Sequence, residues 1–236
     1  MLSFLKVHAV KKKLEEVEAY LDQVLHFEHS EIREFALRTL HAGGKRVRPS
    51  LTILTASMFK NEDNIVPLAA AMELLHMASL IHDDIEDHSE TRRGKPAAYI
   101  TYGMDTAINA GSWLYFQAAT CIEKLNCSVQ MKKNLYSVYT MELRRLHLGQ
   151  AMDIAWHRNT EKIPTVNEYL AMVKNKTGTL ASLAAQTGIL ASGQTLEIAQ
   201  QFGDIAANIG IGFQIIDDVI NLTTGNVGKN CLEIFG

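Results

Sequence analysis

Two groups of acidic residues have the types and the spacing that metal chemistry requires. Asp83, Asp84 and Asp87 form a D-D-x-x-D pattern in "SLIHDDIEDHSETRRGKP", and Asp217 and Asp218 repeat its first two positions in "GFQIIDDVINLTTG". At about 100° per residue, the carboxylates of one cluster project from the same side of a helix. Buried carboxylates need a partner, and hard divalent cations such as Mg²⁺ take carboxylate and phosphate oxygens as ligands. One cluster alone is also compatible with a solvated helix end, but two clusters predict a cation site that binds a phosphate or diphosphate.

Basic residues close to these clusters have the chemistry to bind such an anion. Arg92 and Arg93 follow the first cluster, while Lys45 and Arg48 lie in "GGKRVRP" just after a glycine-marked helix end. An isolated pair of arginines is usually surface charge, but guanidinium groups match phosphate oxygens in bidentate geometry. Next to a metal cluster, this pattern favours phosphate binding.

Four more polar residues share the phase of the acidic clusters or interrupt an apolar helix. His76 lies seven residues before Asp83 and on the same helical face, although a lone helical histidine is most often a packing residue. Gln214 lies one turn before the second cluster. Lys176 and Thr177 interrupt the apolar run around "VKNKTGTL", where the following glycine indicates a local kink. The sequence predicts that this kink points at an anion, with a solvated surface lysine as the alternative.

The elements that must position these residues are all predicted to be helices. Apolar residues recur at helical spacing, as at Leu14, Val17, Leu21 and Leu25, and no segment alternates as a strand would. The pattern predicts helices over roughly residues 50–60, 66–88, 105–125, 130–155, 166–192 and 195–223. Because the loops between them are short and no linker is visible, we expect one all-α domain.

Composition excludes several classes of protein. The 236 residues are 47% hydrophobic and carry a net charge of −3, which is typical of a globular protein and argues against a nucleic-acid surface. The sequence has no run of 18 apolar residues, so no transmembrane segment is expected. The N-terminal residues are more typical of an amphipathic helix than of a targeting signal. Cys121, Cys127 and Cys231 fit neither a disulfide framework nor metal-ligand spacing, which favours a cytoplasmic location.

The motifs also resemble those of a known family. "GGKRVRP", "ELLHMASLIHDDIEDHSETRRGKP", "LHLGQAMDI", "KNKTGTL" and "GFQIIDDVINL" occur in the order and at the intervals of the trans-isoprenyl diphosphate synthases, or polyprenyl synthetases. The resemblance covers about residues 10–230. In its details, including "GQAMDIAW" and an Asn221 in place of a third acid, the chain is most similar to geranylgeranyl diphosphate synthases.

This resemblance implies a fold and an assembly. It implies an all-α, isoprenoid-synthase-type helical bundle around a deep central cavity, normally a homodimer. It places one polyprenyl synthase domain on residues 1–236, and that domain lacks the C-terminal helices with which relatives continue.

The resemblance also implies roles for individual positions. It implies that the acids of the first cluster hold two Mg²⁺ ions on an allylic diphosphate and those of the second cluster hold a third: Asp83, Asp84 and Asp87, then Asp217 and Asp218. The positions that match isopentenyl diphosphate binding are Lys45, Arg48, His76 and Arg93. Those that match binding or orientation of the allylic diphosphate are Arg92, Lys176, Thr177, Gln214 and Lys229. Two of these, Thr177 and Gln214, also match positions that steady the developing carbocation and its loss of a proton.

The implied activity is a Mg²⁺-dependent, head-to-tail trans condensation of isopentenyl diphosphate with an allylic diphosphate. Small residues before the first cluster, Ala78 and Ser79, favour a product of C20 or longer, and "GSWLYF" offers Trp113, Tyr115 and Phe116 as a deeper floor or as plain core. One alternative is a terpene cyclase, against which the intact set of isopentenyl diphosphate positions argues. Another is a non-catalytic partner subunit of a synthase, which the shorter C-terminus favours and the two acidic clusters oppose.

Overall fold

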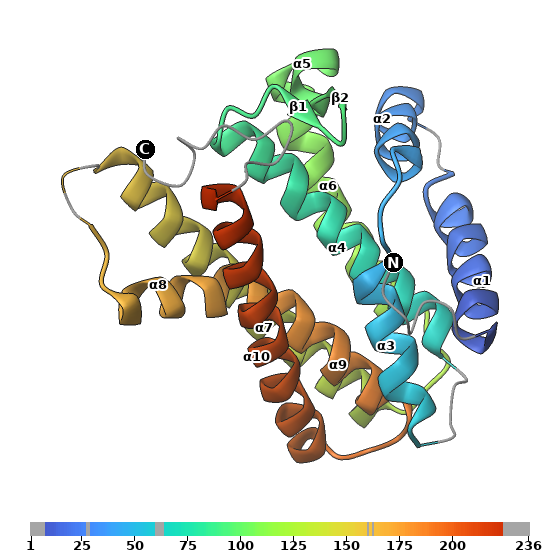
Figure 1. Ribbon diagram of the computed structural model, residues 1–236. Helices are drawn as coiled ribbons and strands as arrows, with labels where there is room; N and C mark the ends of the chain where they lie inside the picture. The colour runs from blue at the N-terminus through green and yellow to red at the C-terminus, as the bar shows by residue number, and fades with distance from the viewer. Residues whose placement is uncertain (1–7, 27–28, 60–63, 160, 162, 224–236) are drawn as a thin grey trace.

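A computed structural model describes residues 8–26, 29–59, 64–159, 161 and 163–223, and these residues form a bundle of helices (Figure 1). The helices in chain order are α1 (His8–Val24), α2 (Ser30–His41), α3 (Val47–Ser57), α4 (Ile65–Glu86), α5 (Ala98–Tyr102), α6 (Met104–Glu123), α7 (Val129–Arg158), α8 (Val166–Val173), the π-helical segment η2 (Lys174–Gly178), α9 (Thr179–Ala191) and α10 (Leu196–Thr223). The prediction of long helices is confirmed, with bounds that differ by a few residues. Lys229 and Cys231 lie outside the described residues.

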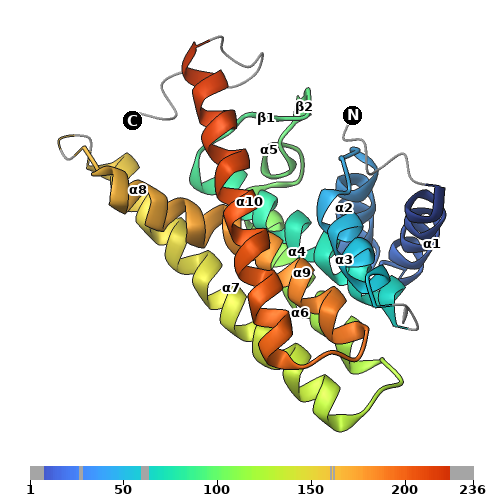
Figure 2. The same ribbon diagram turned by 60° about the horizontal axis from the view of Figure 1, so that its bottom comes forward.

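Helix α4 forms the centre of the bundle, where α1, α3, α6 and α9 pack around it (Figures 1 and 2). Its sequence is apolar on nearly every side, with Leu68, Leu74 and Leu75 fully buried, as expected of a helix that is surrounded by others. By length and composition alone α4 could cross a membrane, yet 67% of its most apolar stretch is buried inside the bundle. Its place in the core therefore accounts for its apolar character.

Glycines allow two pairs of elements to approach closely. A Cβ added to Gly188 of α9 would lie 2.1 Å from Thr55 Oγ1 and 2.3 Å from the Thr52 carbonyl oxygen of α3. A Cβ added to Gly149 of α7 would lie 2.3 Å from the backbone nitrogen of Lys176 in η2. Real Cβ atoms do not tolerate such distances, so the backbones meet here only because no side chain intervenes.

The chain leaves α4 through a short antiparallel pairing of β1 (Thr91–Arg92) with β2 (Lys95–Pro96). Arg93 and Gly94 form the turn with φ values of +56° and +74°, a left-handed conformation that suits a tight hairpin. The helix predicted over residues 66–88 ends at Glu86, just before this hairpin. The strands themselves were not predicted, because two residues are too few to show alternation.

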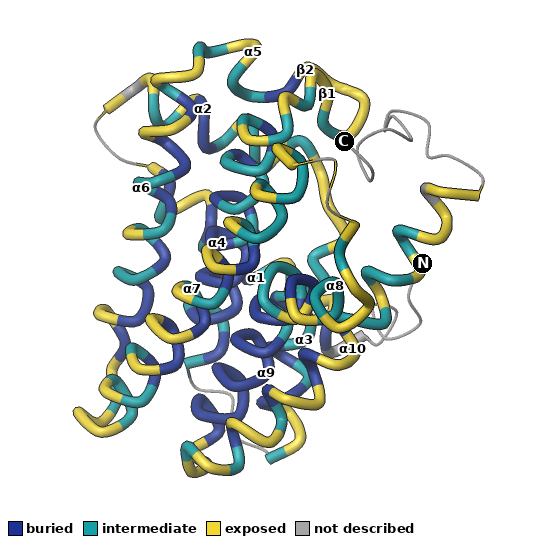
Figure 3. The backbone as a smooth tube through the Cα atoms, turned by 90° about the vertical axis from the view of Figure 1, so that its left-hand side faces the viewer, coloured by how far each residue is buried: buried dark blue, intermediate teal, exposed yellow. Residues whose placement is uncertain are grey.

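Several large apolar side chains remain exposed on the surface of the described chain. Figure 3 colours the backbone by how far each residue is buried. On α10, Ile205, Ile209, Phe213 and Ile216 follow one another at helical spacing, and each is more than half exposed. On α6, Phe116 is 74% exposed. The buried faces of the same helices point into the bundle.

Candidate active site

The two acidic clusters meet at the π-helical segment η2, at the end of the bundle where α4 and α10 both finish (Figure 1). Lys176 Nζ lies 3.0 Å from Asp83 Oδ1, at the end of α4. The next residue, Thr177, donates its hydroxyl to Gln214 Oε1 of α10 at 2.9 Å. Gln214 in turn donates to Asp218 Oδ1 at 2.8 Å. Consecutive side chains of η2 are therefore linked to the two clusters, Lys176 directly to Asp83 and Thr177 through Gln214 to Asp218. π-Helical turns are frequent at functional sites.

Basic side chains neutralise the first two acids. Arg92, returned by the hairpin, donates from Nε to Asp84 Oδ1 at 2.7 Å and lies 3.3 Å from Asp83 Oδ2. Burial alone would raise the pKa of Asp83, but the Lys176 and Arg92 charges outweigh it and hold that pKa below its ordinary value. Burial does raise the pKa of Asp84, despite the bond from Arg92. The negative charges of Asp83 and Asp84 are therefore balanced by neighbouring basic side chains.

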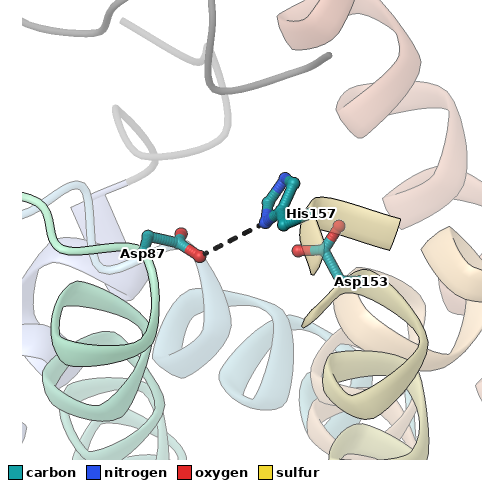
Figure 4. A group of neighbouring side chains, drawn as sticks. All are labelled: Asp87, Asp153 and His157. Carbon is teal, nitrogen blue, oxygen red and sulfur yellow. Dashed lines mark ion pairs between the residues drawn. The ribbon is translucent and has the colours of Figure 1, made fainter. Parts of the chain in front are cut away.

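Asp87 is the least neutralised acid of the cluster (Figure 4). Its Oδ1 is buried and has no hydrogen-bond partner within the described residues. The closest basic atom recorded for it is Nδ1 of His157, 3.9 Å away. Burial and then the neighbouring charge of Asp83 raise the pKa of Asp87 to about 6. A carboxylate held in this state gains strongly from a nearby cation.

The second cluster is held from α8 as well as from α10. Tyr169 of α8 donates its hydroxyl to Asp218 Oδ2, opposite the bond from Gln214. Burial raises the pKa of Tyr169, so its hydroxyl stays a donor. Asp217 is partly buried on the same turn of α10. The carboxylate of Asp218 is thereby fixed in orientation while both of its oxygens accept a bond.

A cluster of basic residues lies beside the first acidic cluster, between the loop that precedes α3 and the hairpin. Gly44 takes a φ of +156°, and a Cβ there would lie 3.1 Å from a guanidinium nitrogen of Arg93, so the loop backbone and Arg93 are in close contact. Arg46, also left-handed with a φ of +48°, binds the buried Glu73 of α4 at 2.7 Å. The loop is thus anchored to the core by an ion pair.

Two predicted residues of this basic cluster carry buried nitrogen atoms that have no hydrogen-bond partner within the described chain. Arg48 Nε and His76 Nδ1 make no hydrogen bond within the described chain. Burial, followed by the charges of Arg48 and Arg93, lowers the pKa of His76 well below its ordinary value, so its ring is neutral. Unsatisfied buried donors are uncommon in native proteins. Their convergence with positive charge fits an anion that brings its own acceptors.

The remaining predicted position in this loop is Lys45, which is exposed. Lys229 lies outside the described residues. The structure adds residues that the sequence analysis did not identify: Gln150, Asp153, His157, Tyr169 and Glu73. Three of these lie on α7 at i, i+3 and i+7, so a search for polar residues on one helical face would have found them.

On α7, Gln150 donates to Asp83 Oδ1 at 3.3 Å and to Glu86 Oε2 at 2.7 Å. Asp153 pairs with Lys176. A third helix therefore supports the first cluster.

A hollow of about 320 Å³ opens between α4, α6 and α7. It is lined by His82, Ser112, Tyr115, Phe116, Ala119, Tyr139, Leu143 and His147. His82 donates from Nδ1 to the Ala78 carbonyl oxygen at 2.9 Å, and its ring stacks on Tyr115 with the ring centroids 5.6 Å apart. The predicted floor residues Tyr115 and Phe116 therefore border an apolar space one turn beyond Ser79.

The chain has clear relatives among characterised proteins. It is 36% identical over 225 residues to the geranylgeranyl diphosphate synthase of Methanosarcina mazei, and the aligned residues cover 94% of this chain and 69% of that protein. It is 38% identical over 193 residues to the geranylfarnesyl diphosphate synthase of Aeropyrum pernix, covering 79% and 60%. The chain thus spans about three fifths to two thirds of the length of these relatives.

Solved structures share the arrangement of the helices. Geranylgeranyl pyrophosphate synthetase from Pyrococcus horikoshii superposes with a TM-score of 0.84 at 32% identity, over 92% of this chain and 66% of that one. A polyprenyl synthase from Caulobacter crescentus, crystallised with calcium and isoprenyl diphosphate, gives 0.85 at 27% identity, over 97% and 69%. The bundle therefore has the all-α isoprenoid synthase fold.

The sequence model of one family, described as polyprenyl synthetase, matches residues 29–233. That stretch contains both acidic clusters, the basic loop and η2, which are the parts that the structure brings to one end of the bundle. The chain belongs to the polyprenyl synthetase family.

Proposed function

We propose that this chain is a Mg²⁺-dependent trans-prenyltransferase that joins isopentenyl diphosphate head-to-tail to an allylic diphosphate. The observation that carries the proposal is the pairing of two incomplete half-sites. One is an acidic cluster with an Asp87 oxygen that lacks a hydrogen-bond partner within the described residues, and the other is a basic cluster in which Arg48 and His76 nitrogens lack one. A cation and an anion complete them together, and two diphosphate substrates supply the anions.

The acidic half fits hard divalent cations. Its donors are all carboxylate oxygens, and burial raises the pKa values of Asp84 and Asp87, to which the charge of Asp83 also contributes. We propose that Asp83, Asp84 and Asp87 hold two Mg²⁺ ions and that Asp217 and Asp218 hold a third. The Caulobacter crescentus relative was crystallised with a divalent cation and an isoprenyl diphosphate, which supports this assignment.

The basic half would take isopentenyl diphosphate. Arg48 and Arg93 offer guanidinium forks, Lys45 adds a flexible ammonium at the rim, and neutral His76 donates a ring N–H. The ion pair from Arg46 to Glu73 holds the loop so that these donors are already oriented. Pre-orientation lowers the entropic cost of binding.

The allylic diphosphate would lie between the two clusters, within reach of Arg92 and Lys176. The Arg92 and Lys176 side chains form ion pairs with Asp83 in the described structure. On substrate binding they would exchange these ion pairs for bonds to phosphate oxygens. Bound Mg²⁺ would neutralise the diphosphate as the C–O bond breaks.

The carbocation that remains would face the oxygens of Thr177 and Gln214, which are fixed by their mutual bond at 2.9 Å. The double bond of isopentenyl diphosphate attacks this cation, and the released diphosphate takes the proton that is then lost. Apolar walls keep water from capturing the cation.

Product length would follow from the space beyond Ala78 and Ser79. Ala78 is fully buried, and the Ser79 hydroxyl donates to the His76 carbonyl oxygen at 2.9 Å and so stays close to its own helix. The 320 Å³ hollow adjoins the next turn. We infer a product of C20 or longer, in keeping with the names of the relatives from Methanosarcina mazei and Aeropyrum pernix.

We also infer that the chain acts in the cytoplasm as a homodimer. Met104, Ile108 and Phe116 form an exposed apolar stripe on α6 at intervals of four and eight residues. The hollow joins this stripe to Leu143 and His147 of α7, so the apolar surface extends across two helices. Contiguous apolar surface of this kind marks interfaces.

The test is an assay of the purified chain with Mg²⁺, labelled isopentenyl diphosphate and allylic primers of increasing length. We expect Mg²⁺-dependent elongation of a primer to C20 or beyond. A hydrocarbon formed without isopentenyl diphosphate would instead identify a cyclase. Activity that appears only after addition of a second synthase subunit would identify a partner subunit.

A further inference from the structure

One group of side chains beside the first cluster contains a nitrogen ligand. Asp87 ends α4, while Asp153 and His157 lie one turn apart on α7 and face it (Figure 4). One ligand atom from each of these three residues lies within 4.8 Å of the other two. Two ligands at i and i+4 share one face of a helix, which is how helical metal motifs present a pair of donors.

The distance between the Asp87 and His157 ligand atoms suits two ligands of one shared ion better than a hydrogen bond between them. Asp87 Oδ1 and His157 Nδ1 are 3.9 Å apart, beyond hydrogen-bond range. Two ligands that bind one ion at about 2.0–2.2 Å lie roughly 3–4 Å from each other. The Asp87 oxygen is buried and otherwise unpartnered within the described chain. A cation between the two atoms would therefore satisfy both.

The nitrogen ligand changes which cation is favoured. Mg²⁺ takes oxygen ligands almost exclusively, whereas imidazole nitrogen suits first-row transition ions such as Fe²⁺, Ni²⁺ and Zn²⁺. The Asp153 side chain is 13% exposed and the Asp87 side chain is 21% exposed, so the ion would be partly shielded from water. Lys176 pairs with Oδ2 of Asp153, and a carboxylate has a second oxygen for a metal.

We propose that Asp87, Asp153 and His157 bind one divalent first-row transition-metal ion, with His157 as a nitrogen ligand, so that this position prefers such an ion to Mg²⁺; Mn²⁺ is the paramagnetic probe of the site. The inference rests on the proposed function in one respect, since Asp87 belongs to the cluster assigned to the allylic diphosphate. It goes further in assigning a third helix and an imidazole to the metal site.

Pulsed electron paramagnetic resonance of the purified chain with one equivalent of Mn²⁺, with and without inorganic diphosphate, tests the assignment directly. We expect a ¹⁴N coupling from a directly bound imidazole in the wild-type spectrum. The coupling disappears in His157→Ala, and Mn²⁺ affinity falls by at least about tenfold, the loss seen when even outer-shell partners of a metal are removed. Substitution by His157→Asp makes an all-oxygen site, and the ratio of Mg²⁺ to Mn²⁺ affinity rises.

The matched control is His41→Asn, because His41 Nε2 also lies beside a single carboxylate, 3.2 Å from Asp22 Oδ1, but far along the chain from the site. This variant keeps the ¹⁴N coupling. Circular dichroism verifies that each variant is folded, and the wild-type spectrum is decisive without any variant.

Bound Mn²⁺ without ¹⁴N coupling, or a coupling that survives in His157→Ala, overturns the inference and leaves the proposed activity intact. Failure to bind Mn²⁺ even with diphosphate also overturns the inference, whereas only the absence of Mg²⁺-dependent elongation overturns the proposed activity.

Discussion

Buried polar atoms without a hydrogen-bond partner concentrate at the site. In the described part of the chain such atoms occur on Arg48, His76, Asp87 and Gln186. Three of these four residues were singled out from the sequence by helical phase or motif. Leaving a buried polar group unpaired costs about 1–3 kcal/mol. The ligand-free chain is therefore destabilised at the positions where ligands would restore the missing bonds.

Arg48 offers a direct test of this relation. We expect Arg48→Met to leave the free energy of unfolding unchanged or to raise it slightly, because an unpaired donor and a charge disfavoured by burial are both removed, which offsets the lost attraction to Glu73. The KM for isopentenyl diphosphate should rise by about ten- to hundredfold, the equivalent of one charge-assisted bond. Urea unfolding and steady-state kinetics measure the two effects. The exposed Arg158→Met is the control, and equal effects from both variants would contradict the expectation.

Asp87 predicts a pH dependence of stability in the absence of metal. Because its pKa is raised to about 6, the folded chain keeps a proton that the unfolded chain releases near pH 4. The free energy of unfolding therefore falls as pH rises from about 4 to 6, by at most about 3 kcal/mol for this group. We expect Asp87→Asn to be more stable than wild type at pH 7.5 but not at pH 4, measured by urea unfolding.

The exposed Asp204→Asn serves as the control for this experiment, with no such pH-dependent difference. A constant difference between Asp87→Asn and wild type across this pH range would show that the Asp87 carboxyl does not titrate as described.

Ser79 tests the assignment of product length. It lies one turn before Asp83 on α4, and we expect Ser79→Phe to place a ring in the path of the growing chain and to give products shorter than C20. Mass spectrometry of the products measures this. The control Ser137→Phe adds the same ring at an exposed position of α7 and should leave chain length unchanged. An unaltered product from Ser79→Phe would remove this residue from the tail-binding space.

At the scale of single residues, sequence reasoning was strongest where residues share a helix. Asp83, Asp84 and Asp87 are close in sequence, and the 100° rotation per residue places them without knowledge of the fold. The bonds from Tyr169 to Asp218 and from Arg46 to Glu73 join different helices. Such pairs depend on how helices cross, which local periodicity does not encode.

At the scale of elements, η2 is where the helical pattern of the sequence and the structure differ. The predicted helix over residues 166–192 is divided into α8, η2 and α9, and the kink expected at Lys176 is a π-helical turn. The adjacent Gly149 lets α7 reach this turn. The hydrophobic periodicity predicted the helices well because their apolar faces drive packing. A π-helical turn as short as η2 is not resolved by a pattern that is read over about 11–18 residues.

Gly149 tests the importance of that contact. An added Cβ would lie 2.3 Å from Lys176 N, so we expect Gly149→Ala to destabilise the chain by about 1–3 kcal/mol and to lower kcat by displacing Lys176. Gly212→Ala on α10, whose Cβ meets nothing within 4 Å, should instead be neutral or slightly stabilising. Urea unfolding distinguishes them. Similar stability of the two variants would mean that α7 and η2 separate at little cost.

At the scale of the whole molecule, the sequence predicted the fold class correctly, but it did not show which apolar faces stay exposed. Phe116 was considered as a cavity floor or plain core, and it borders the hollow while being 74% exposed. An aromatic residue in an apolar run looks the same in sequence whether its neighbours come from its own chain or from a second one.

The proposed homodimer gives the last test. We expect Phe116→Asp to shift the chain from dimer to monomer in sedimentation velocity, because a charge would be buried at the interface. Val129→Asp, at an even more exposed apolar position at the start of α7, should leave the dimer intact. A wild-type chain that sediments as a monomer at micromolar concentration would contradict the assembly.

The adjacency of Lys176 and Thr177 has a thermodynamic consequence for the order in which ligands load. One peptide unit connects the side chain that contacts Asp83 to the side chain that contacts Gln214 and, through it, Asp218. A ligand that pulls either side chain far enough to shift this shared backbone displaces the other side chain. Occupancy at the end of α4 would then change ligand affinity at the end of α10, and by linkage the reverse effect would be equal in free energy. Titrations of the two positions should accordingly be interdependent rather than additive.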